Sequence, residues 1–95
     1  MSDYIALIDG SPGAFGAVFP DLPRCTSGGA TMDEVYRNAM EAVRLWADEA
    51  RADGEELPKP RDTQALRSEP HVAEALAQGS VLALIPLRED IKADH

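Results

Sequence analysis

The sequence predicts a single α+β domain in which helices pack against an antiparallel sheet. Short apolar runs separated by turn signals fill the first 30 residues, and one long amphipathic stretch follows them. The expected order along the chain is strand, strand, strand, long helix, short helix, strand, with one or both helices on one side of the sheet. A chain of 95 residues has room for one such core but not for two.

The first expected strand, Tyr4 to Asp9, has two apolar faces. Ile5 and Leu7 lie on one face, and Ala6 and Ile8 lie on the other, because side chains alternate along a strand. A first strand with this pattern is expected to be covered on both sides.

A hairpin and a third strand follow. Residues 10–13 (GSPG) are a concentrated turn signal, and residues 14–19 supply the second strand of an antiparallel pair. Pro20 and Pro23 remove two amide donors, so the chain is expected to turn between them. Residues 25–29 form a third strand of small residues, which lets a helix or another backbone come close.

A long helix is expected from Met32 to about Asp53. Thr31 and Glu34 have the spacing of a capping box, in which the carboxylate returns to the amide of the capping residue. Gly54 is a natural helix stop. The apolar positions of the helix recur at helical spacing: Val35, Ala39, Ala42, Val43, Trp46 and Ala50.

The last third of the chain predicts a short helix and a strand. Residues 61–68 are polar and are expected to be irregular, whereas Pro70 suits the first turn of a helix over residues 71–78. Residues 80–87 are expected to form a strand that is covered on both faces. Pro86 indicates a sheet edge or the end of the strand. We therefore assign residues 1–88 to the domain and residues 89–95 to a charged tail.

Composition limits the classes of function. The formal net charge is −8 and the pI is near 4.5, so the surface repels phosphate backbones and attracts basic proteins, although acidic charge also serves solubility alone. Cys25 is the single cysteine, which excludes an intrachain disulfide and suits a reducing cytoplasm. The sequence shows neither an export signal nor a membrane-spanning apolar run, so we expect a cytoplasmic protein.

Catalytic and metal sites have weak support. Asp9 and Glu41 could be nominated for a divalent-metal nuclease, but the last strand offers no acidic side chain to complete the site. Cys25, His71 and His95 have no recognisable metal-ligand spacing, and Cys25 is expected to be a small buried hydrophobe. Phosphate binding at Gly28-Gly29 is disfavoured because Thr31 and Glu34 occupy the helix amides. We expect no catalytic residue, metal or cofactor.

The stretch FPDLPRCTSGGATMDEVYRNAMEAVRLWADEA, residues 19–50, resembles the HicB-like antitoxin family. Arg24 stands where the family usually has Gly, and Ser27 stands where it usually has Thr. Because Gly accepts positive φ far better than Arg, we expect a different type of turn at Arg24. The positions that match the family pattern are Phe19, Pro20, Asp21, Leu22, Pro23, Cys25, Gly29, Thr31, Glu34, Asn38, Ala39, Glu41, Ala42, Pro58 and Pro60.

The resemblance implies a truncated ribonuclease H-like fold and a role as the antitoxin of a type II toxin-antitoxin system. The expected partner is a HicA-like ribonuclease toxin, neutralised by protein binding and steric block of its active site, and the expected assembly is a homodimer or higher homo-oligomer. Asp21, Glu34 and Glu41 are the expected toxin contacts. The residues expected to shape the motif are Pro20, Pro23, Cys25, Gly29, Thr31 and Asn38.

Many relatives carry a DNA-binding module after the last strand, but the residues beyond Arg88 are too few to form one. We therefore expect none in this chain as given; a longer chain or a partner could supply DNA binding.

Two other hypotheses stay open. An orphan domain of the same fold could bind another basic protein or a small ligand. A divalent-metal nuclease that uses Asp9 or Glu41 ranks last.

Overall fold

Four antiparallel strands form one sheet in the order β3-β2-β1-β4. The computed structural model describes residues 3–87, so the expected tail at 89–95 and the domain boundary at 88 lie outside the described residues. The elements are β1 (Asp3–Ser11), β2 (Ala14–Val18), β3 (Thr26–Gly29), α1 (Met32–Ala52), α2 (Thr63–Arg67), α3 (Pro70–Ala77) and β4 (Val81–Pro86).

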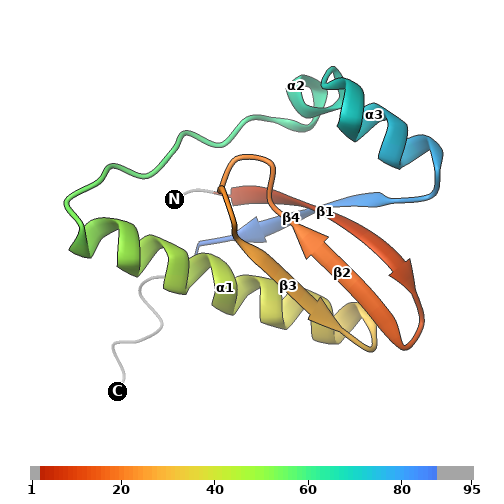
Figure 1. Cartoon of the computed structure of the whole chain (residues 1–95), viewed down its shortest axis with the longest axis horizontal. Helices are drawn as coiled ribbons and strands as arrows, with labels where there is room; N and C mark the ends of the chain where they lie inside the picture. The colour runs from red at the N-terminus through yellow and green to blue at the C-terminus, as the bar shows by residue number, and fades with distance from the viewer. Residues whose placement is uncertain (1–2, 88–95) are drawn as a thin grey trace.

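β1 lies inside the sheet and is buried on both faces. Tyr4, Ala6 and Ile8 join the cluster that contains the buried face of α1. Ile5 and Leu7 join a second cluster, on the opposite face, with residues of α2 and α3. Figure 1 shows α1 and the α2–α3 pair on different sides of the sheet. The prediction that both faces of this strand are covered is confirmed, and α1 is the one helix on its face among the described elements.

The ends of α1 follow from local side chains. The Glu34 amide donates to the Thr31 hydroxyl at 3.0 Å, as expected of a capping box. The Glu34 carboxylate, however, accepts from the Ala30 amide at 2.6 Å, one residue before the amide that we expected. The helix ends at Ala52, and Gly54 follows with φ +76°.

The expectation of irregular structure over residues 61–68 was wrong in part. Thr63–Arg67 form the short helix α2. The Ala65 amide donates to the Asp62 carboxylate at 2.8 Å, which satisfies a free amide of the first turn. Leu66 is fully buried in the second cluster. One cap and one buried leucine therefore order a segment whose remaining side chains are exposed.

The last helix matches the prediction closely, and the last strand forms where it was expected. The expectation that both faces of this strand are covered was wrong, because Val81 and Leu84 are 45% and 56% exposed and only Ile85 is buried. α3 begins at Pro70, one residue earlier than expected, and Gly79 follows its end with φ +110°. β4 pairs only with β1 in the described sheet, so it is an edge strand, as Pro86 suggested.

Small residues in β3 let the strand lie against α1. A Cβ added to Gly29 would lie 2.6 Å from the Val35 amide nitrogen, which is closer than any real side chain tolerates. The Asn38 side-chain amide donates to the Gly28 carbonyl at 2.7 Å, and the Ser27 hydroxyl donates to the Val35 carbonyl at 3.3 Å. The expected close approach of a helix to this strand is thus confirmed.

The turn before β3 corrects one expectation. Arg24 has φ +65° and is the one non-glycine residue with positive φ among residues 3–87. The turn at this position therefore keeps the conformation that suits the usual glycine, and Arg24 bears the steric cost of it.

Gly29→Ala should destabilise the fold, because the new methyl group must push α1 away from β3. Overpacking of this kind costs about 1–3 kcal/mol. Gly28→Ala is the control, since its Cβ would approach only the Phe15 carbonyl oxygen, at 3.3 Å. Urea denaturation of both variants checks the prediction, which fails if the two lose equal stability.

Replacing Arg24 should reveal the cost of its backbone conformation. We expect Arg24→Gly to be more stable than Arg24→Ala by about 1 kcal/mol, because only alanine retains a Cβ in the left-handed region. Both variants lose the guanidinium, so their difference isolates the backbone. Thermal denaturation measures it, and equal stabilities would contradict the assignment.

Candidate protein-binding surface

Asp21, one of the three expected contact residues, fastens distant parts of the chain together. Its side chain is 8% exposed and lies 2.6 Å from the Arg61 guanidinium. It also accepts from the Arg61 backbone amide at 2.8 Å, while Arg61 reaches Glu69 at 2.7 Å. Hydrogen bonds to Glu69 and Asp21 raise the pKa of Arg61. Contact of Asp21 with a partner stays a prediction.

Glu34 and Glu41 lie on the exposed surface of α1. The Glu34 carboxylate accepts a hydrogen bond from the Ala30 amide. The Glu41 side chain is 58% exposed and lies 2.9 Å from Arg44, which also approaches Asp48 at 3.7 Å. Because residues seven apart share a helix face to within about 20°, Glu34, Glu41 and Asp48 form one acidic stripe.

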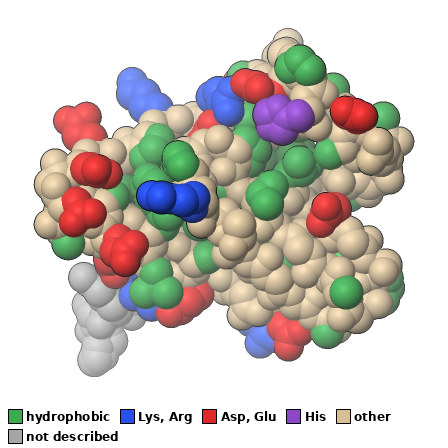
Figure 2. Space-filling view, viewed as in Figure 1, with side chains coloured by type: hydrophobic (Ala, Val, Ile, Leu, Met, Phe, Trp, Pro, Cys, Tyr) green, Lys and Arg blue, Asp and Glu red, His purple; other side chains and the backbone are tan. Residues whose placement is uncertain are grey.

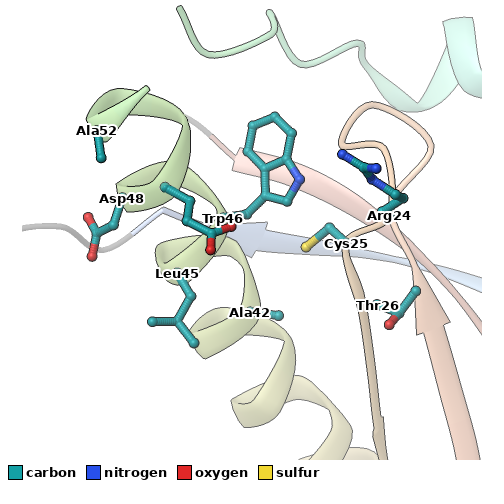
Figure 3. Close-up of a pocket in the computed structure, with 9 residues that line it drawn as sticks. Arg24, Cys25, Thr26, Ala42, Leu45, Trp46, Asp48 and Ala52 are labelled. Carbon is teal, nitrogen blue, oxygen red and sulfur yellow. The ribbon is translucent and has the colours of Figure 1, made fainter. Parts of the chain in front are cut away.

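A groove of about 500 Å³ lies between the start of β3 and the C-terminal half of α1. In Figure 3, Arg24 and Cys25 extend from the β3 side toward Trp46, whereas Leu45 and Asp48 project from α1. The residues that line it, called here the Trp46 groove, are Arg24, Cys25, Thr26, Ala42, Leu45, Trp46, Asp48, Glu49 and Ala52.

The contact between α1 and β3 explains where the groove opens. At the N-terminal half of α1 the space is closed, because Gly29 lies against Val35 and Asn38 bridges to Gly28. No glycine stands at residues 24–26, opposite the later turns of α1. Helix and strand therefore touch at one end and leave a hollow at the other.

Trp46 forms a fixed wall of the groove. Its indole Nε1 donates to the Pro23 carbonyl at 2.9 Å, and its ring packs against the main cluster. This packing agrees with the place of Trp46 on the predicted apolar stripe of the helix. The same side chain also borders the groove, which the apolar pattern did not indicate.

Leu45 is the functional candidate that the sequence reasoning missed. It is 52% exposed and lines the groove from α1. A large apolar residue outside the buried stripe of a helix is the signal that could have identified it, because such a residue gains nothing from the core.

Carboxylates surround the groove. Asp48 and Glu49 line it, and a second hollow of about 90 Å³ shares Arg24, Trp46 and Glu49 and adds Asp53 and Glu55. Among residues 3–87, four carboxylates and one guanidinium thus border the two hollows. Figure 2 shows acidic side chains gathered at the left, over the C-terminal end of α1, beside an apolar area.

Cys25 has the structural role that we expected. It is 4% exposed and belongs to the main cluster. Burial raises the pKa of the Cys25 thiol to about 11, so the thiol stays neutral and unreactive near neutral pH. Within residues 3–87, no three side chains of His, Cys, Asp or Glu come together in a way that could hold a metal ion.

A comparison with protein-family models identifies the family of the chain. The model of the HicB-like antitoxin of bacterial toxin-antitoxin systems matches residues 4–90. The chain belongs to the HicB-like antitoxin family. No curated protein sequence matches it. None of the helices described within residues 3–87 has the length and hydropathy of a membrane-spanning segment.

Solved structures of HicB antitoxins share the fold. The N-terminal domain of Burkholderia pseudomallei HicB is 23% identical, with a TM-score of 0.72, and the match covers 90% of this chain and 98% of that one. A chain from the HicA3–HicB3 toxin-antitoxin complex is 26% identical, with a TM-score of 0.71 and coverage of 88% and 95%. The HicB-like α+β prediction is confirmed, and the ribonuclease H-like detail stays a prediction.

A longer relative places the HicB-like domain within a larger antitoxin. The match to B. pseudomallei HicB has 25% identity and a TM-score of 0.75, and covers 90% of this chain but 63% of that one. The described fold therefore corresponds to one part of that antitoxin.

Cys25 should resist thiol reagents in the folded protein at pH 8 and react after denaturation. Because burial raises the pKa of this thiol, its neutral form contributes to the free energy of unfolding. That contribution is complete below pH 9 and is lost as the pH rises through about 11. Ellman's reagent tests the first statement. A stability profile of wild type against Cys25→Ala tests the second, which fails if the two profiles run parallel.

Proposed function

We propose that this antitoxin neutralises a HicA-like ribonuclease toxin by binding it and blocking its active site. The acidic stripe of Glu34, Glu41 and Asp48 on α1 carries the proposal, since a basic RNA-cleaving protein fits a surface of this charge. Membership of the HicB-like family supports it, as does the similarity to a chain from a HicA3–HicB3 complex.

Electrostatic attraction explains how the two proteins would meet. The whole chain carries a net charge of −8, and opposite net charges raise the rate of encounter. Glu41 offers the more accessible carboxylate, whereas Asp21 acts mainly by holding the segment after α1 through Arg61. Glu34 supports the stripe while capping the helix.

The proposed role requires no catalysis by this chain. The HicB-like family name denotes an antitoxin, and steric block needs only a surface that covers the toxin's active site. We also propose that the protein acts in the cytoplasm as a homodimer or higher homo-oligomer, since β4 pairs only with β1 among residues 3–87 and so offers a sheet edge for pairing. Scattering mass in solution tests the assembly, and the mass of one 10.2 kDa chain would reject it.

Glu41→Lys should weaken the complex with a HicA-like toxin, because it reverses a charge of the stripe whose side chain is 58% exposed. We expect association to slow by roughly tenfold at low salt and the difference to shrink at high salt. Glu74→Lys on α3 is the control for net charge. Stopped-flow association and rescue of toxin-arrested growth are the measurements, and equal effects of both variants would contradict a contact at Glu41.

A further inference from the structure

We infer that the Trp46 groove is the docking site for a segment of the toxin that carries an apolar side chain flanked by lysine or arginine. The inference rests on the proposed function for the identity of the partner, but the chemistry of the segment comes from the groove itself. It places the centre of contact beside the C-terminal half of α1, beyond Asp21, Glu34 and Glu41.

The floor of the groove calls for an apolar anchor. Cys25, Ala42 and Ala52 offer no charged group, and Leu45 stands half exposed beside them. A leucine in water loses the free energy that burial would bring, so an apolar side chain seated beside Leu45 would be favoured. The hollow of about 500 Å³ is large enough for such a side chain.

The charges at the rim of the groove favour a positively charged segment. Carboxylates of Asp48, Glu49, Asp53 and Glu55 border the groove and the adjoining hollow. In the part of the chain that the structure describes, the guanidinium of Arg24 is the one positive group that lines them. Arg44 approaches Asp48 at 3.7 Å but pairs more closely with Glu41, so the rim keeps a negative excess. An acidic or uncharged segment gains no attraction there, which selects a basic partner.

The groove is also formed in advance. The hydrogen bond from Trp46 to Pro23 fixes the ring, and the contact of Gly29 with α1 fixes the distance between helix and strand. Little ordering is then required on binding, and preorganised surfaces of this kind bind more tightly for the same area. The stripe that contains Glu41 lies one helical turn from Leu45, so both surfaces could contact one partner.

Two matched variants test the groove with the toxin. Leu45→Ser removes the exposed apolar wall. Met32→Ser is the control, because Met32 is 44% exposed and lies in the first turn of α1, at the end away from the groove. Calorimetry with the cognate HicA-like toxin should show affinity reduced about tenfold or more for Leu45→Ser and unchanged for Met32→Ser. Equal affinity of Leu45→Ser and wild type for the toxin would reject the Trp46 groove as the docking site. The proposed antitoxin function would be unaffected by that result.

A peptide titration tests the groove without the toxin. Trp46 is the single tryptophan of the chain, so its fluorescence reports on the groove directly. The tryptophan-free peptide acetyl-KRLFRK-amide should change the emission, whereas acetyl-EELFEE-amide and acetyl-KRSSRK-amide should not. Added salt and Glu49→Lys should weaken the response, and Glu74→Lys should not.

The outcomes of the two experiments separate the two proposals. A peptide response without toxin binding would support the groove and reject the HicA-like partner. Toxin binding that is insensitive to Leu45→Ser, or a response to the acidic peptide as strong as that to the basic one, would reject the groove. Circular dichroism of each variant shows that a lost response does not come from unfolding.

Discussion

The burial of both faces of β1 is the constraint on which the rest of the fold depends. All side chains from Tyr4 to Ile8 are buried, and a strand buried on both sides must have a layer on each face. α1 supplies one layer, and α2 with α3 supplies the other. The segment between α1 and α2 must therefore cross from one face to the other, and the pairing of Asp21 with Arg61 holds it there.

The same constraint gives α1 its functional surface. Because α1 covers its face of the sheet alone, its buried side is fixed and its outer side is free to carry charge. Gly29 brings the first turns of α1 against β3, and the larger residues that precede β3 leave the later turns apart. The Trp46 groove and the acidic stripe then lie next to each other, which joins apolar and electrostatic recognition on one helix.

Local chemistry made much of this fold predictable. The spacing of Thr31 and Glu34 indicated the start of α1, and Gly54 indicated its end. Alternation in β1 indicated the two covered faces. The helix α2 was missed because only Asp62 and Leu66 order it, and a single cap and a single buried residue give no periodic signal.

Contacts between residues that are distant in the sequence could not be predicted from local sequence patterns. The pairing of Asp21 with Arg61 joins residues 40 positions apart, and no local spacing indicates such a contact. The Trp46 groove depends on the distance between α1 and the start of β3, which composition does not set. Leu45 could be noticed in the sequence as an apolar residue outside the buried stripe of the helix. Its assignment to a binding surface also required the groove beside it, which only the structure shows.

Hydrogen-deuterium exchange of the antitoxin with and without its HicA-like toxin tests the central claim most directly. Toxin binding at the acidic stripe and the Trp46 groove should slow exchange in residues 41–52 and 24–26 and leave α2 and α3 unchanged. Slowed exchange confined to α2, α3 and β4 would place the toxin on the opposite face and contradict the account.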